Sequence, residues 1–280
     1  MTDTALAGRK AWVTGGATGM GREVALALAG LGADVAVSSL PVSEKGTLRP
    51  EQNAYTLTDA ELEKTRAEIA AKGVNALALG FNITKDDSVQ QTFDAIEKAF
   101  SRVDILVNAA GHSARAFMAN HPDAIWHAII DVCLTGHYRT IKRALPGMIE
   151  RKWGRIVNFA STAANVGAPA HAAYCAAKSG VLGLTRCVAL EGAPHGVSCN
   201  AINPGFVDTP QSRIAQRQQK AIDNLSDMPD DEYREVIRKQ IPQQRWIPAR
   251  EVGALVAFLC RDEAFAITGE DITIAGGSLW

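Results

Sequence analysis

The sequence predicts an α/β fold in which helices cover both faces of a doubly wound parallel sheet. Short apolar runs with strand character alternate with helical patterns along the chain, which is typical of parallel strands joined by crossover helices. Glycine-rich and polar segments follow several of these runs, at the strand ends where such sheets bind ligands. These segments are 15–21, Asn82, 108–111, Ser161 and 204–209.

The expected elements follow in order from this alternation. Runs rich in Val, Ile, Leu and Ala have the character of buried strands, and longer amphipathic patterns indicate helices. The strands are 10–14, 34–38, 75–81, 103–107, 155–159, 197–202 and 271–274. The helices are 22–29, 59–72, 86–101, 123–149, about 172–191 and 251–260. Because no linker, repeat or low-complexity segment divides the chain, we expect one domain over 1–280.

The composition is globular and argues against several classes of function. The 280 residues are 47% hydrophobic and 21% charged, with a net charge of −1. This balance gives no reason to expect a nucleic acid or a membrane as partner, and no apolar run approaches the roughly 20 residues of a membrane span. Five cysteines without a C-x-x-C pair indicate reduced thiols in a cytoplasmic protein. The six histidines show no metal-ligand spacing, so we expect no metal.

A glycine-rich turn, 15–21, stands between the first predicted strand and the first helix. Glycines let the backbone approach a pyrophosphate, and the free N–H groups and dipole of the helix favour its negative charge. The spacing is G-x-x-x-G-x-G. In this strand–turn–helix context it predicts nucleotide binding by a Rossmann-type fold, although a turn that needs glycine only for packing would look the same.

The second predicted strand ends in Ser38, Ser39 and Leu40 and has no acidic residue at its tip. An acid there holds the adenosine ribose of NAD and would repel a 2′-phosphate, so its absence favours NADP(H) over NAD(H). No arginine follows immediately to bind the phosphate, but Arg22 or Arg49 could reach it. Residues 41–58 are polar and interrupted by proline and glycine, and we expect an insertion beside this site.

Tyr174 and Lys178 lie four residues apart in a predicted helix, so they share one face. A free tyrosine has a pKa of about 10, and a nearby cation would lower that pKa and favour the phenolate. Such a pair can exchange a proton with an alcohol or a carbonyl. The spacing is common, and by itself it also fits an unremarkable helix.

Over nearly its whole length the chain resembles the short-chain dehydrogenase/reductase family. The turn from Thr14 to Gly21 resembles the family's cofactor turn, and the segment 108–111 resembles its N-(N/A)-A-G motif. Ser161 stands thirteen residues before Tyr174, which is the family's usual interval. The segment 204–209 resembles the one that lies beside the nicotinamide.

The resemblance implies an NAD(P)-dependent oxidoreductase that interconverts a secondary alcohol and a ketone. Tyr174 would be the general acid/base, Lys178 would lower its pKa and bind the nicotinamide ribose, and Ser161 would hydrogen-bond the substrate oxygen. The resemblance also implies a homo-oligomer, a tetramer or a dimer, and a small-molecule alcohol or ketone as substrate. The implied cofactor contacts are Gly15, Thr18, Gly19, Met20, Gly21, Ser39, Asn82, Ile83, Asn108, Ala109, Gly111, Tyr174, Lys178, Pro204, Gly205, Val207 and Thr209.

Two features qualify this prediction. Cys133 stands where the family usually has a catalytic asparagine, whose main-chain carbonyl holds a water. A regulatory or scaffold protein on the same fold, with weakened chemistry, is therefore the alternative function.

The long polar segment 209–241 predicts a helical lid over the substrate, and a solvated pair of surface helices is the alternative for that segment.

Overall fold

A parallel sheet forms the centre of the molecule. The computed structural model describes residues 4–40 and 59–278, and within these ranges seven strands pair in the order β3-β2-β1-β4-β5-β6-β9. Every pairing in this sheet is parallel. The strands are β1 (Lys10–Thr14), β2 (Asp34–Ser39), β3 (Ala76–Gly80), β4 (Ile105–Asn108), β5 (Gly154–Phe159), β6 (Val197–Pro204) and β9 (Asp271–Ile274). The predicted doubly wound parallel sheet is confirmed.

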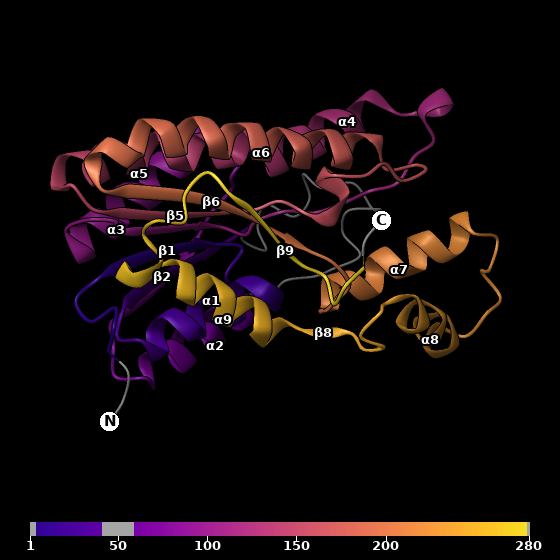
Figure 1. Ribbon diagram of the computed structural model, residues 1–280, viewed down its shortest axis with the longest axis horizontal. Helices are drawn as coiled ribbons and strands as arrows, with labels where there is room; N and C mark the ends of the chain where they lie inside the picture. The colour runs from indigo at the N-terminus through magenta and orange to yellow at the C-terminus, as the bar shows by residue number, and fades with distance from the viewer. Residues whose placement is uncertain (1–3, 41–58, 279–280) are drawn as a thin grey trace.

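Helices cover both faces of this sheet, as Figure 1 shows. Side chains alternate between the faces of a strand. In β1, Val13 accordingly packs in the core under α1, α2 and α9, whereas Trp12 packs in the core under α3 and α5. These helices are α1 (Gly19–Gly30), α2 (Asp59–Ala70), α3 (Asp86–Phe100), α5 (Gly136–Arg151) and α9 (Ala249–Leu259). Among the described residues, no helix has the length and apolar character needed to cross a membrane.

One predicted helix is wrong in part. The stretch 123–149 is not a continuous α-helix: α4 (Asp123–Ile130) and α5 are separated by a π-helical turn, η3 (Asp131–Thr135). A π turn closes i→i+5 hydrogen bonds and is frequently found at functional sites. Sequence periodicity did not reveal it because a single wide turn changes the helical phase by only about one residue.

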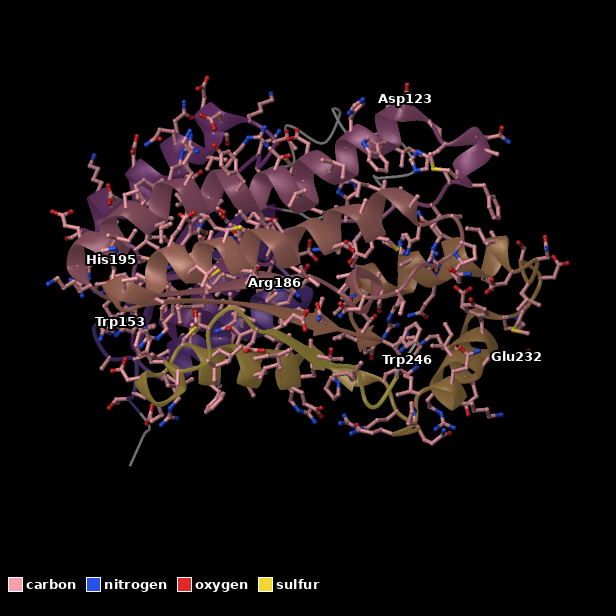
Figure 2. The ribbon with its side chains drawn as sticks, turned by 45° about the horizontal axis from the view of Figure 1, so that its top comes forward. Asp123, Trp153, Arg186, His195, Glu232 and Trp246 are labelled. Carbon is pink, nitrogen blue, oxygen red and sulfur yellow. The ribbon has the colours of Figure 1, made fainter. Side chains whose placement is uncertain are left out.

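The polar segment after β6 forms two helices, α7 (Pro210–Ile222) and α8 (Asp230–Gln240), which fits both the lid and the solvated pair of helices expected for it. They lie together beyond one end of the sheet (Figure 1). Trp153 and His195, which directly precede β5 and β6, label the opposite end in Figure 2. The two helices therefore lie at the carboxyl ends of the strands. We call α7 and α8 the lid helices.

The base of the lid helices is held by contacts that the sequence did not predict. Two short strands, β7 (Val207–Asp208) and β8 (Ile247–Pro248), pair in parallel where the lid segment leaves and rejoins the domain. Phe206 and Trp246 pack edge-to-face beside them, with ring centroids 5.8 Å apart. Figure 2 shows Trp246 at this end of the molecule. The Arg234 guanidinium of α8 lies 4.3 Å from the Trp246 ring centroid. The predicted insertion at 41–58, with Arg49, lies outside the described residues.

Candidate active site

A cavity of about 450 Å³ lies at the carboxyl end of the sheet. It is bounded by the glycine turn, the ends of β2, β3 and β4, the π turn and the start of α7. Of the residues named from the sequence as cofactor contacts, eleven line it: Gly15, Thr18, Gly19, Met20, Gly21, Ser39, Asn82, Ile83, Ala109, Gly111 and Thr209. Six do not: Asn108, Tyr174, Lys178, Pro204, Gly205 and Val207. The sequence did not indicate Asp131 and Val132 of η3 or Gln218 of α7, which also line it.

The glycine turn has the geometry of an anion site. Gly15 has a φ of +68°, and a Cβ there would lie 2.8 Å from the backbone of Ala110, so only glycine fits without strain. Thr18 is the N-cap of α1, but its side chain makes no capping hydrogen bond, and the first turn of α1 contains no acidic residue. The N–H groups at this helix start therefore face the cavity without a side-chain acceptor, which suits a pyrophosphate.

The end of β2 bears on the choice between the two nicotinamide dinucleotides. Ser38 is buried, and its Oγ accepts a hydrogen bond of 2.9 Å from Trp12 Nε1, whereas Ser39 lines the cavity. Arg22, one of the two arginines expected to reach a 2′-phosphate, is paired with Glu23 and Glu68. Arg22 is thus already neutralised by protein carboxylates.

Asn108 belongs to a buried polar network and not to the cavity wall. Its Nδ2 donates to Asn158 Oδ1 at 2.9 Å, and its Oδ1 accepts from Thr140 Oγ1 at 2.6 Å. Asn158 Nδ2 in turn donates to Thr185 Oγ1 at 3.0 Å. The network joins β4 and β5 to α5 and α6 (Ala172–Gly192). Because the Asn108 amide is used inside the protein, a cofactor contact at this position falls to its main chain.

Tyr174, Ser161 and Lys178 come together at the start of α6. The helical spacing places Lys178 Nζ 5.6 Å from the Tyr174 ring centroid. Ser161 follows β5, and its hydroxyl lies close enough to Tyr174 to lower the pKa of the phenol. Lys178 is 3% exposed, and its Nζ donates to the Phe159 carbonyl at 2.6 Å. The three side chains that the sequence singled out therefore form one cluster, in which Lys178 is buried and Ser161 and Tyr174 are partly exposed.

The pKa shift of Tyr174 differs from the expectation. We expected Lys178 to lower the pKa of Tyr174, but burial raises the pKa of the Tyr174 hydroxyl well above its ordinary value. The Ser161 hydroxyl opposes this effect and lowers the pKa. Burial also lowers the pKa of Lys178. Desolvation disfavours the charged form of both groups, and the Lys178 ammonium is directed at the Phe159 carbonyl instead of the phenol oxygen.

Cys133 lies in the π turn next to this cluster. It is fully buried, and its thiol donates a hydrogen bond of 3.2 Å to the His112 carbonyl. A Cβ built on Gly111 would lie 3.6 Å from both Cys133 Sγ and Lys178 Nζ, which shows how close these groups are. Cys133 therefore lies near Lys178, and its thiol already has an acceptor.

The segment after β6 connects the cluster to the lid helices. The Gly205 N–H donates to the Ile274 carbonyl of β9 at 3.0 Å, which holds this segment against the sheet edge. Thr209 lines the cavity and forms a capping box with Ser212 at the start of α7. Thr209 thus contributes to both the cavity wall and the beginning of the lid.

Two residues beside Tyr174 were not found from the sequence. The His171 ring stacks on the Tyr174 ring, with centroids 4.7 Å apart and planes 16° apart. Arg115, from the loop after β4, lies close enough to Tyr174 to lower its pKa electrostatically. A lone histidine and a lone arginine in loops follow no motif, so no sequence signal identified them.

Comparison with known proteins identifies the class. A family model described as enoyl-(acyl carrier protein) reductase matches residues 15–278. The uncharacterized oxidoreductase YxjF of Bacillus subtilis is 36% identical, with 95% of this chain and 96% of that protein aligned. The 3-oxoacyl-(acyl-carrier-protein) reductase FabG of Staphylococcus aureus is 33% identical over 96% of this chain and 97% of its own. The chain belongs to the short-chain dehydrogenase/reductase family, as its motifs implied.

Solved structures agree with this assignment. Actinorhodin polyketide ketoreductase with NADPH superposes with a TM-score of 0.86 at 30% identity, covering 96% of both chains. NAD⁺-bound xylitol dehydrogenase superposes with a TM-score of 0.84 at 28% identity, covering 97% of this chain and 99% of that one. The protein is an NAD(P)-dependent oxidoreductase. Because these neighbours include one complex with each dinucleotide, they do not decide between NADP and NAD.

Proposed function

We propose that this protein interconverts a secondary alcohol and a ketone, with Tyr174 as the general acid/base. The observation that carries the proposal is the cluster of Tyr174, Ser161 and the buried Lys178 at the carboxyl end of the sheet, beside the cavity. The nicotinamide of the bound dinucleotide supplies the hydride acceptor or donor. The chain's own residues hold the substrate oxygen and move its proton.

The proton chemistry follows from the positions of the hydroxyls. The Ser161 hydroxyl lies close enough to Tyr174 to lower its pKa, so one substrate oxygen can interact with both hydroxyl groups. Two donors on that oxygen stabilise the charge that develops when the carbonyl is reduced. Because burial keeps Tyr174 protonated at neutral pH, the residue is suited to give a proton to a ketone. Lys178 would contact the ribose of the nicotinamide and support the phenolate once the proton has left.

The dinucleotide contacts proposed here are those named from the sequence. Support comes from the cavity lining, the positive φ of Gly15 and the uncapped start of α1. Ser39 in the cavity wall, with no acidic residue at the end of β2, favours NADP(H) modestly over NAD(H). Arg22 gives no added support, because it is paired with two glutamates.

Cys133 is proposed to act through its backbone. Its thiol donates its hydrogen bond to the His112 carbonyl. Its main-chain carbonyl in the π turn is therefore the group proposed to hold a water, which would extend a proton path toward Lys178. The alternative of a scaffold with weakened catalysis would need this path to fail.

The wider context of the enzyme is also a proposal. One catalytic domain spans 1–280, and the lid helices cover a small-molecule substrate. The cysteines among the described residues are all free thiols, which suits the cytoplasm. A homo-oligomer, a dimer or a tetramer, rests on the family resemblance alone.

The test is Tyr174→Phe, with Tyr138→Phe as the matched control. Tyr138 lies on α5 and is 47% exposed. Ketone reduction and dinucleotide binding are measured side by side with NADPH and NADH. We expect Tyr174→Phe to lower kcat/KM by at least about 100-fold, since general acid catalysis contributes that much or more. Its affinity for the dinucleotide should stay within about threefold, and the control should be unchanged. Full turnover by Tyr174→Phe would refute the assignment.

A further inference from the structure

Arg115 is a cation with unused hydrogen-bonding capacity near the catalytic cluster. Its Nε and Nη1 atoms are buried and have no hydrogen-bond partner. Burial of part of the side chain lowers the pKa of its guanidinium, and the residue as a whole is half-buried. A buried donor without a partner costs about 1–3 kcal/mol, and more when the group is charged. Such a group is unfavourable unless a ligand supplies the acceptor.

The backbone around Arg115 is held against the start of α6. Ala114, which precedes it, is buried in one cluster with Ala173, and Tyr174 packs against the same cluster. The N–H of Ala116, which follows it, donates to the Ala170 carbonyl at 3.0 Å. The backbone on both sides of Arg115 is therefore held next to the segment that contains His171 and Tyr174.

His171 adds a second unused nitrogen at the same place. Its ring stacks on Tyr174, and its Nε2 is buried without a hydrogen-bond partner. Burial and the nearby Arg115 lower the pKa of His171 to about 4, so the imidazole is neutral at physiological pH. A neutral imidazole with its proton on Nε2 would be a donor beside the Arg115 guanidinium.

The carboxylate of Asp223, which acts electrostatically on Arg115, already accepts two hydrogen bonds. The nearby groups that raise the pKa of Arg115 include Tyr233 on α8, Asp223 at the end of α7, and Tyr174. Asp223 Oδ2 accepts from the Tyr233 hydroxyl at 2.7 Å, and its Oδ1 accepts from Gln219 Nε2 at 2.7 Å. The guanidinium thus lies between the catalytic tyrosine and the lid, and its buried donors lack a protein acceptor.

We propose that Arg115, with His171 beside it, binds a carboxylate on the substrate, so that the enzyme acts on small oxo- and hydroxycarboxylates. The inference rests on the proposed function, because it places the carboxylate next to the carbonyl group that Tyr174 would protonate. A carboxylate supplies acceptors for both kinds of donor and neutralises the buried cation, which makes charge-assisted hydrogen bonds. Neutral ketones of the same size leave these donors unpaired.

The experiment compares three acids with their neutral counterparts. The acids are 2-oxobutanoate, 3-oxobutanoate and 4-oxopentanoate, and each is paired with its methyl ester. The N-acetylcysteamine thioester of 3-oxobutanoate serves as a neutral acyl-thioester probe. Reduction is followed with the preferred dinucleotide in the wild type, Arg115→Met and Arg115→Lys. The control is Arg217→Met, because Arg217 is a lid arginine whose side chain is 69% exposed.

The wild type should reduce at least one acid with a kcat/KM at least about tenfold above that of its ester. Arg115→Met should lower kcat/KM for that acid on the order of 100-fold, mostly through KM, and leave the ester within about threefold. Arg115→Lys keeps the charge and should recover part of the activity toward the acid. The control variant should behave as the wild type.

Three results would overturn the inference: esters or the thioester reduced as well as the acids, an acid preference that survives in Arg115→Met, or an equal loss for acids and esters. The last would mean that Arg115 holds the lid. Binding is also measured calorimetrically with the dinucleotide present. If the wild type reduces none of these compounds, the proposed function fails. The inference is then decided by binding alone. It stands if the wild type binds an acid that Arg115→Met does not bind, and it fails if neither protein binds an acid.

Discussion

Replacing Asn108 by Asp tests the buried polar network with an almost isosteric change. The Asn108 amide is fully buried, and its Nδ2 donates to Asn158 Oδ1 at 2.9 Å. In Asn108→Asp this donor becomes a carboxyl oxygen that faces another acceptor. A protonated carboxyl can still donate to Asn158 Oδ1, but an ionised one cannot. The folded protein should therefore favour the protonated acid, and its pKa should rise.

The size of the effect follows from the burial. Full burial raises the pKa of a carboxyl by about 3 to 5 units from an unfolded value of about 3.9. The variant then binds more protons when folded than when unfolded at any pH between those two pKa values. Its stability relative to the wild type falls as pH rises, by about 1.4 kcal/mol per unit, until the folded pKa is passed. The destabilisation should be about 2 kcal/mol at pH 5.5 and about 4 to 6 kcal/mol at pH 8.5.

Urea unfolding at both pH values measures this difference. The wild type is measured under the same conditions, so that only the change caused by the substitution is compared. Asn120→Asp is the control, because Asn120 is exposed in the short helix Met118–Asn120 and its carboxyl should stay solvated. The control should change the free energy of unfolding by less than about 0.5 kcal/mol. A destabilisation by Asn108→Asp that is the same at pH 5.5 and pH 8.5 would refute the reasoning.

The remaining predictions concern α6, Arg22 and the catalytic proton. Gly183→Ala should stabilise the protein by about 0.5–1 kcal/mol in urea unfolding, because the exposed helical position has no atom within 4 Å of an added Cβ. Gly180→Ala in the same helix should destabilise it, because the Cβ would lie 2.8 Å from Leu134 Cδ2; stabilisation by both would contradict this account. Arg22→Ala should change the ratio of NADPH to NADH affinity, measured by nicotinamide fluorescence, by less than about threefold; a large drop would show that Arg22 leaves its glutamates. Because the pKa of Tyr174 is raised, little phenolate exists at neutral pH, so alcohol oxidation should accelerate from pH 6 to pH 9; a plateau below pH 7 would contradict it.

Features encoded by local patterns could be predicted from the sequence. Burial on both faces gives parallel strands continuous apolar runs, and these runs located the strands of the central sheet to within a few residues. The pairing of Tyr174 with Lys178 depends only on helical spacing. The Gly15 turn depends on a backbone conformation that one residue type tolerates. Each of these signals lies within a few consecutive residues.

Features that depend on distant segments could not be predicted in this way. The π turn at Asp131–Thr135 leaves a sequence with ordinary helical character. The convergence of Arg115 and His171 on Tyr174 needs two loops from different strands to be joined by a backbone hydrogen bond. Arg22 looked available to a phosphate until the fold brought Glu68 of α2 beside it.

By itself, the sequence determined the family, the order of the elements and the three residues expected to carry the chemistry. The tertiary structure alone decided the charge state of those residues and their surroundings. The reason is that desolvation depends on every segment packed around a group, whereas periodicity and spacing report only neighbours along the chain. For Tyr174, this packing raised the pKa instead of lowering it, and it placed nearby Arg115, whose buried Nε and Nη1 atoms have no hydrogen-bond partner.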